Sequence, residues 1–362
     1  MEISIISLGN PFDSKTWSKA PYSIIESLKK QNVVVSGINL TCFYNKLESW
    51  YFKIQRHFFF SGLCRSFFLY KKTCNRFSKV IEQSSSDYFL FMSEHCLDRK
   101  YQNKKFYLYV DSAMRPYYKY MPMNLFQRIC YLCTLGIYEK NDRKSYSYLT
   151  KVFTQNDWTR NYLIHNYHLS PNKVINVGVG VNLVPLMEEK SYDNNLLLIV
   201  LRNHKTIEKI KGLPLLLAAF RILHKEMHNV SLAIVGTKGK EEPGVTYYFN
   251  QPRCKTEELF KLSTLYVMPA LCEPNGITYL EALANKTPIV GLNRFAFPEF
   301  SGYGKYGFIC PCDDPKTLSC VLKNALLDKN KLKEMGEEGQ KYVINRFSWE
   351  NVVNRMANEI FN

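Results

Sequence analysis

The chain has 362 residues, 46% of them apolar, and carries 48 Lys and Arg against 32 Asp and Glu, a formal net charge of +16. This length suits two domains of about 180 residues better than one core, and no apolar run reaches the roughly 18 residues that a membrane-spanning helix needs. The 11 cysteines are odd in number and scattered, which favours free thiols in a reducing cytoplasm over a disulfide framework.

Strand and helix patterns alternate through the first half of the chain. Residues 3–8 predict a buried strand rather than a signal peptide, Pro21 opens a helix, and residues 33–38 predict a second strand. Together they make a βαβ unit, which opens a doubly wound α/β sheet. Further strands are expected over 88–92, 106–110 and 151–154, and further helices over 125–149 and 156–167.

An acid follows the predicted strand 106–110. Because ligands of doubly wound folds bind beyond the carboxyl ends of the strands, Asp111 is a candidate active-site residue. The alternative is that Asp111 caps a helix.

The excess of positive charge lies in the first half. Residues 1–182 carry 25 Lys and Arg against 12 Asp and Glu, whereas residues 183–362 carry 23 against 20. The segment 46–79 holds eight basic residues, one acid and many aromatic rings, and is expected to be helical. It is either an amphipathic helix with its rings on the sheet, or a surface that docks on an anionic membrane or acceptor. No nucleic-acid recognition motif accompanies it, so nucleic acid is not expected as a partner.

The same alternation restarts in the second half. Strands are expected over 196–201, 230–236, 246–249, 265–268 and 288–292, with helices over 213–225, from 256 and over 331–342. Residues 171–182 form the natural linker. We therefore predict a first domain over 1–182, a second over 183–347, and a terminal helix over 348–362.

The segment 269–288, PALCEPNGITYLEALANKTP, follows a short strand and opens a helix. The first amides of a helix lack intrahelical partners and bind phosphate, and Gly276 allows close backbone approach. Carboxylates at Glu273 and Glu281 can bind hydroxyl groups. Phosphates at the amides and sugar hydroxyls at the carboxylates together suggest a nucleotide sugar.

The pattern E-P-N-G-I-T-Y-L-E, with seven residues between Glu273 and Glu281, resembles the glutamate-seven-glutamate motif of retaining family 4 glycosyltransferases. The resemblance implies a GT-B fold, in which two Rossmann-like domains face each other across a cleft and a C-terminal helix crosses back to the first domain. It further implies that Glu273 contacts the donor sugar and Glu281 the ribose. The other residues that it implies at the donor, on the diphosphate and around the base, are Arg202, Lys211, Gly236, Pro252, Arg253, Asn275, Gly276, Ile277 and Thr278.

Four departures from the family pattern stand out. Lys19 replaces a glycine in the loop D-S-K-T-W-S-K-A-P-Y, and Gly178 and Asn182 replace a proline and an acid. The spacing between Arg202 and Lys211 is also longer than usual, which makes Lys205 and Lys209 alternative cations for the diphosphate.

These observations predict an enzyme that transfers a sugar, with retention, from a UDP- or GDP-sugar to a glycan, glycolipid or other acceptor in cell-surface polysaccharide synthesis. The resemblance makes Glu273 and Asp111 its catalytic candidates, with no metal or other cofactor. The alternatives are a GT-B protein that binds nucleotide sugars without catalysis and a nucleotide-sugar epimerase of the same fold. We expect a cytoplasmic protein, and the basic segment raises the option of attachment to the inner face of a membrane.

Overall fold

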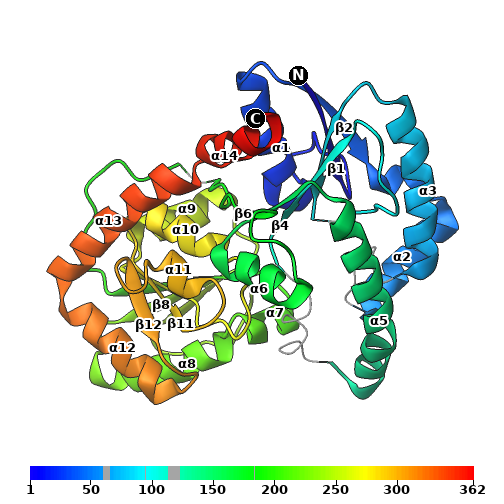
Figure 1. The fold of residues 1–362 in the computed structure, drawn as a ribbon. Coiled ribbons are helices and arrows are strands. Elements are labelled where there is room, and N and C mark those ends of the chain that lie inside the picture. The colour runs from blue at the N-terminus through cyan, green and yellow to red at the C-terminus, as the bar shows by residue number, and fades with distance from the viewer. Residues whose placement is uncertain (60–65, 94, 113–122, 183) are drawn as a thin grey trace.

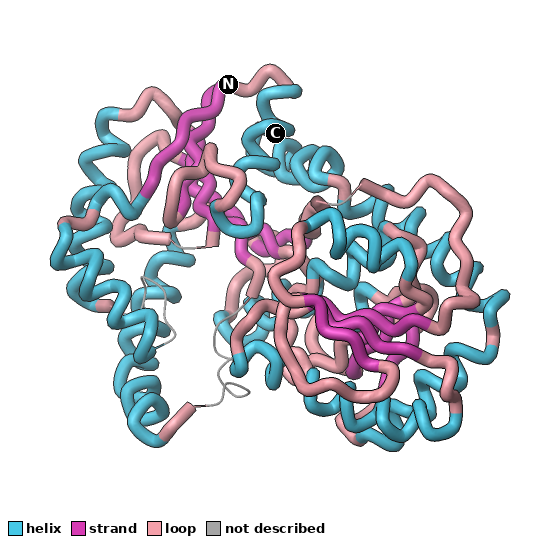
Figure 2. The backbone as a smooth tube through the Cα atoms, turned by 180° about the vertical axis from the view of Figure 1, so that it is seen from behind, coloured by secondary structure: helices cyan, strands magenta, loops and turns pink. Residues whose placement is uncertain are grey.

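A computed structural model describes residues 1–362 except 60–65, 94, 113–122 and 183. It contains two six-stranded sheets, every named strand pair is parallel, and helices cover the sheets (Figure 1). Seen from the opposite side, the two sheets are separate and lie in two halves of the molecule (Figure 2). The α/β architecture with two doubly wound units is thus confirmed.

The first sheet has the strand order β2-β1-β3-β4-β5-β6. Its strands are β1 (Glu2–Ser7), β2 (Val34–Asn39), β3 (Tyr88–Met92), β4 (Lys105–Val110), β5 (Lys151–Thr154) and β6 (Val174–Asn176). The strand β6 was not predicted, because its three residues lie inside the segment interpreted as a linker. It pairs with β5 and completes the edge of the sheet.

The second sheet has the order β12-β11-β10-β7-β8-β9. Its strands are β7 (Leu196–Val200), β8 (Ser231–Val235), β9 (Val245–Tyr248), β10 (Leu265–Val267), β11 (Ile289–Leu292) and β12 (Gly307–Cys310). Leucine, isoleucine and valine fill its inner strands because helices bury both faces of a parallel sheet. One continuous core joins these strands to the helices around them.

The helices are divided between the two halves of the chain. Those of the first half are α1 (Ala20–Lys30), α2 (Lys46–Phe59), α3 (Phe67–Gln83), α5 (Leu125–Tyr148) and α6 (Asp157–Tyr167). Those of the second half are α7 (Lys205–Ile210), α8 (Leu213–Glu226), α9 (Arg253–Leu262), α10 (Ile277–Ala284), α11 (Phe297–Phe300), α12 (Pro315–Leu327), α13 (Lys329–Phe347) and α14 (Trp349–Phe361).

The last helix returns to the first half, as the sequence predicts. Ser348 separates α13 from α14 and caps α14, since its hydroxyl accepts a hydrogen bond from the Asn351 amide at 3.3 Å. Val352, Val353 and Met356 are buried in the same core as residues of β1 and α1. The helix α14 therefore lies beside α1 (Figure 1) and ties the end of the chain to the first sheet.

In its described residues the basic segment is helical, as expected, and contributes to the helices α2 and α3 on either side of 60–65. Phe52, Leu69 and Phe77 are buried in a core on the first sheet. Glu48, its one acid, is also buried and binds Arg76 at 2.7 Å and Lys72 at 2.8 Å. The hydrogen bond from Arg76 is the largest of the contacts that lower the pKa of Glu48 to about 2. Part of the segment's positive charge therefore has a structural partner.

Candidate active site between the two sheets

The loop between β10 and α10 carries the predicted phosphate-binding turn. Gly276 caps α10 with a φ of 59°, in the left-handed region that glycine adopts most readily. The Glu273 carboxylate accepts hydrogen bonds from the Gly276 amide at 2.8 Å and the Asn275 amide at 3.3 Å. These amides lie at the positive end of α10, so the carboxylate occupies an anion-binding position.

Lys211 lies against the same carboxylate. Its ammonium group forms an ion pair with the second oxygen of Glu273. Gly212 makes this approach possible, because a Cβ at that position would lie 2.0 Å from the Pro269 carbonyl oxygen. Burial lowers the pKa of Lys211 to about 8, the charge of Arg202 acts in the same direction, and the Glu273 carboxylate favours the charged ammonium.

The long spacing between Arg202 and Lys211 has a structural cause. The helix α7 fills the interval, so the extra residues form a helical turn and leave Lys211 on the loop of Glu273. Arg202 is exposed after β7, and its guanidinium lies 3.5 Å from the Ser18 hydroxyl of the first half. Lys205 and Lys209 are exposed on α7.

The second glutamate lies further along α10. Glu281 is largely buried, its carboxylate lies 3.5 Å from the Arg253 guanidinium at the start of α9, and Pro252 caps that helix. Burial raises the pKa of Glu281 to about 6, whereas Arg253 opposes the shift. Gly236 follows β8 with a φ of 89°, and a Cβ there would lie 2.0 Å from the Leu201 carbonyl oxygen. These residues share the edge of the second sheet where its strands end.

Asp111 follows β4 in the first sheet, as predicted. Its carbonyl oxygen accepts a hydrogen bond from the Thr159 hydroxyl at 3.2 Å, and the Ser112 hydroxyl lies 3.4 Å from its carboxylate. Burial raises the pKa of the Asp111 carboxyl group. The carboxylate is thus held in a poorly hydrated environment at the end of a central strand.

Two polar residues after β5 join the sheets, and their role was not predicted. The Asn156 side chain donates a hydrogen bond to the Pro274 carbonyl at 2.8 Å, and its oxygen accepts one from the Thr159 backbone amide at 2.8 Å. Gln155 accepts a hydrogen bond from the Asn275 side chain. Asp111 is therefore connected to the loop of Glu273 through Thr159 and Asn156. The only sequence signal was that Asn156 opens a helix just beyond a strand.

Glu299 makes a second bridge between the halves. Its carboxylate accepts hydrogen bonds from the Asp157 amide at 2.7 Å and the Asn176 side chain at 3.1 Å. Burial, followed by the negative charge of Asp157, raises the pKa of Glu299 to about 7, and the two hydrogen bonds only partly offset this. We call these three residues the Glu299 clamp.

The departures at Lys19 and Asn182 are accommodated in one contact region. Lys19 has a φ of 70°, which explains why a glycine suits this position, and its ammonium extends over the Tyr22 ring at 5.8 Å. Asn182 accepts from the Trp349 indole at 2.9 Å and donates to the Ser18 carbonyl at 3.1 Å. An aspartate could not make the second bond, since a carboxylate only accepts.

Comparison with known protein families gives a match in the second half of the chain. Residues 189–342 match the family model described as "Glycosyl transferases group 1". The group 1 match contains Arg202, Lys211, Glu273 and Glu281 but leaves the first sheet uncovered.

Two curated proteins are similar to parts of the chain. An alpha-maltose-1-phosphate synthase of Mycolicibacterium smegmatis is 29% identical over 107 residues, which are 28% of each protein. The capsular polysaccharide biosynthesis glycosyltransferase CapM of Staphylococcus aureus is 22% identical over 254 residues, 64% of this chain and 62% of CapM. The matched part thus spans less than two thirds of either relative.

Solved structures match the fold of the whole chain. A sucrose-phosphate synthase from Thermosynechococcus elongatus has a TM-score of 0.70 at 14% identity, covering 99% of this chain and 98% of its own. WaaG, a glycosyltransferase involved in lipopolysaccharide biosynthesis, has a TM-score of 0.68 at 13% identity, covering 99% and 100%. The predicted GT-B fold is therefore confirmed.

The Glu299 clamp leads to a prediction about stability and pH. A carboxyl group whose pKa rises from 4.5 to about 7 on folding binds its proton more tightly in the folded state. Its contribution to the free energy of unfolding therefore falls as pH rises through this window. We expect Glu299→Gln, which cannot ionise, to gain about 2 kcal/mol relative to wild type between pH 4.5 and 7, allowing for partial exposure.

Urea denaturation at a series of pH values measures this difference. Glu338→Gln is the matched control, because that carboxylate is solvent-exposed and its pKa is lowered by Lys341 and Lys305. A difference between Glu299→Gln and wild type that stays constant with pH would contradict the assignment of a raised pKa to Glu299.

Proposed function

We propose that this protein is a retaining glycosyltransferase of family 4, which transfers a sugar from a UDP- or GDP-sugar to a glycan, glycolipid or other acceptor. The observation that carries the proposal is the convergence of Lys211 and the backbone amides of Asn275 and Gly276, just before α10, on Glu273. The group 1 match over 189–342 and the GT-B fold support it. CapM, named for capsular polysaccharide biosynthesis, supports a role in cell-surface polysaccharide synthesis.

The diphosphate of the donor fits the positive end of α10. In our proposal Lys211, Arg202 and the amides of residues 275–278 receive its oxygens, so they stabilise the negative charge that develops as the nucleotide leaves. Lys211 already forms an ion pair with the Glu273 carboxylate, and this contact supports the placement of an anionic diphosphate beside it. These cations supply the charge neutralisation, so the proposed reaction includes no metal ion.

The nucleoside fits the neighbouring edge of the second sheet. Glu281 lies on α10, whereas Glu273 lies on the loop before that helix. The Glu281 side chain is largely buried, and its carboxylate can accept hydrogen bonds from ribose hydroxyls. Gly236, Pro252 and Arg253 lie at the same edge of the second sheet, and their backbone would contact the base. Ionisation of Glu281 matters for this role, because a protonated carboxyl accepts fewer hydrogen bonds.

The first sheet faces the reacting carbon from the other side. We place the donor sugar between Glu273 and Asp111. Its anomeric carbon gains oxocarbenium character as the nucleotide diphosphate departs. Gln155 and Asn156 form hydrogen bonds directly with the loop of Glu273. The residues from the two sheets therefore meet at the sugar only when the sheets lie against each other. Domain closure would therefore complete the site and exclude water from the sugar.

Donor turnover tests this proposal. We expect Glu273→Gln to lower sugar transfer or donor hydrolysis by about 10²-fold, because it removes a contact to the reacting sugar. UDP binding should persist in this variant and weaken in Glu281→Gln. Glu257→Gln on α9 is the control, since Glu257 is more exposed and also pairs with Arg253.

A panel of UDP- and GDP-sugars, followed by calorimetry and product analysis, gives the measurement. Unchanged turnover in Glu273→Gln would refute the site assignment. Tight nucleotide binding without turnover would favour a non-catalytic binding protein, and formation of an epimerised sugar without acceptor would favour an epimerase.

We further propose that the acceptor is reached at the inner face of an anionic membrane. The helices α2, α3 and α5 form the outer edge of the first half (Figure 1). Large apolar side chains on them are exposed: Leu47, Trp50, Tyr51, Phe68, Leu125, Phe126, Ile129 and Leu132. Exposed lysines of α2 and α3, namely Lys46, Lys53, Lys71 and Lys79, add positive charge to this half, a combination that suits the interface of an anionic bilayer. Within the described residues, no helix is both long and apolar enough to span a membrane.

Vesicle sedimentation tests this surface. The protein should bind vesicles that contain phosphatidylglycerol, and salt should weaken the binding because exposed charges are screened. Leu125→Ser with Phe126→Ser should reduce partitioning at least about tenfold, since two side chains then lose apolar burial. Leu327→Ser, an exposed leucine of the second half, is the control. Binding that ignores both salt and the double substitution would contradict the proposal.

A further inference from the structure

A cavity of about 510 Å³ lies beside the junction of α13 and α14, and none of its lining residues belongs to the proposed donor site. Tyr306, one of them, precedes β12 and so marks the amino ends of the strands. Glu273, Arg202 and Gly236 follow the carboxyl ends of their strands, at the opposite edge of a parallel sheet. The cavity is therefore separate from the cleft where we place the donor.

Positive charge dominates this cavity. The Arg355 guanidinium donates to the Val177 carbonyl at 2.6 and 2.8 Å and to the Arg346 carbonyl at 2.5 Å, which are all uncharged acceptors. Across the described part of the chain, neither arginine forms an ion pair with a carboxylate. Glu338, the one acid of the lining, is shared between Lys341 at 3.2 Å and Lys305 at 3.3 Å. An anion in the cavity would offset this excess.

The backbone is shaped to admit Arg355. Gly178 has a φ of 84°, and a Cβ there would lie 3.2 Å from the Arg355 guanidinium and 3.3 Å from the Phe347 ring. The family pattern has proline at this position, and proline cannot adopt that backbone angle. Glycine at position 178 therefore leaves room for the Arg355 guanidinium against the linker.

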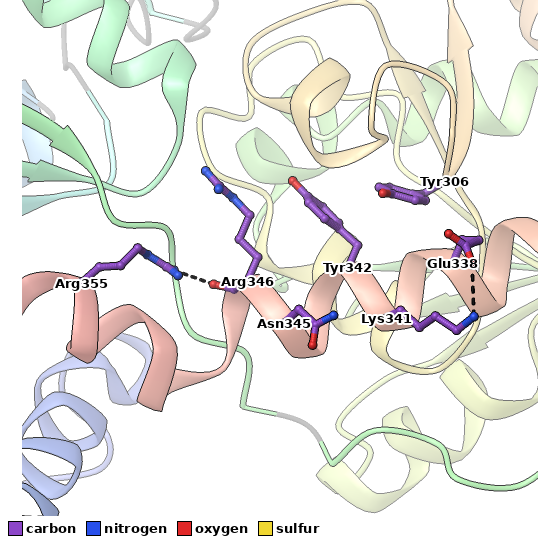
Figure 3. A pocket seen from close by; sticks show the side chains of 7 residues that line it. All are labelled: Tyr306, Glu338, Lys341, Tyr342, Asn345, Arg346 and Arg355. Atoms are coloured by element: carbon purple, nitrogen blue, oxygen red, sulfur yellow. Dashed lines mark hydrogen bonds and ion pairs between the residues drawn. The ribbon is translucent and has the colours of Figure 1, made fainter.

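An aromatic surface adjoins the arginines. The rings of Tyr306 and Tyr342 are stacked, with centroids 4.8 Å apart and an angle of 25° between their planes. Figure 3 shows Tyr342 and Arg346 projecting from α13 to the same side, where Tyr306 also lies. Ring faces pack against the apolar face of a sugar, and the tyrosine hydroxyls can exchange hydrogen bonds with its hydroxyls.

We propose that this cavity binds a small phosphorylated sugar, with its phosphate on Arg346 and Arg355 and its sugar ring against Tyr306 and Tyr342. Such a ligand would join α13 of the second half to α14, which packs on the first half. It would therefore act on the arrangement of the two sheets without entering the donor cleft. This proposal is independent of the reaction assigned to that cleft.

Isothermal titration calorimetry with saturating UDP in the cell tests the site, because UDP keeps the donor cleft occupied. The probes are a panel of hexose phosphates that includes glucose 1-phosphate, together with inorganic phosphate and glucose. We expect one hexose phosphate to bind with a stoichiometry near one and more tightly than either inorganic phosphate or glucose. Arg346→Gln should weaken that binding at least about tenfold, because a charge-assisted hydrogen bond is lost.

Arg99→Gln is the matched control, since that exposed arginine pairs with Asp98 away from the cavity and should leave binding unchanged. Circular dichroism and UDP affinity establish that Arg346→Gln is folded. Absence of saturable binding by the whole panel at about 10 mM, or equal binding in Arg346→Gln, would overturn the site. Equal affinity for inorganic phosphate would overturn the role of the tyrosines. If the wild type binds a hexose phosphate but not UDP, the proposed donor cleft is refuted and the hexose phosphate site is retained.

Discussion

The charge balance at the start of α10 is the constraint on which the rest of the arrangement depends. The backbone amides of Asn275 and Gly276 lie just before the first turn of α10, and Lys211 adds a full positive charge next to them. Glu273 satisfies both in the structure described here. A donor diphosphate would compete for the same groups, which would free the Glu273 carboxylate to turn toward the sugar. In this account Glu273 holds the two amides and Lys211 together, and it is also the residue proposed to contact the donor sugar.

That balance needs both halves of the chain. Gly212 and α7 bring Lys211 to the loop from within the second sheet, whereas Gln155 and Asn156 hold the loop from the end of β5. The Glu299 clamp and the helix α14 add contacts further from the reacting centre. Contacts between the two halves therefore hold the backbone of the loop that carries Glu273.

Local sequence patterns were enough to predict much of this structure. Alternating apolar strands, helix starts and the E-P-N-G turn predicted the two sheets, the placement of Glu273 and Asp111 after strands, and that of Glu281 on the following helix. Contacts between distant segments were not accessible. The bonds of Asn156 and Gln155 to the loop join residues more than a hundred positions apart, and β6 has three residues inside an apparent linker. The helix α7 also explains the long spacing between Arg202 and Lys211.

The affinity of the Lys211→Met variant for UDP tests the central claim most directly. Calorimetry should show at least about tenfold weaker binding than wild type, because Lys211 is the cation held on the phosphate-binding loop. Lys205→Met removes an exposed lysine of α7 and should leave the affinity within about twofold. Thermal denaturation would establish that both variants are folded. A Lys211→Met protein that binds UDP as tightly as wild type would contradict the account.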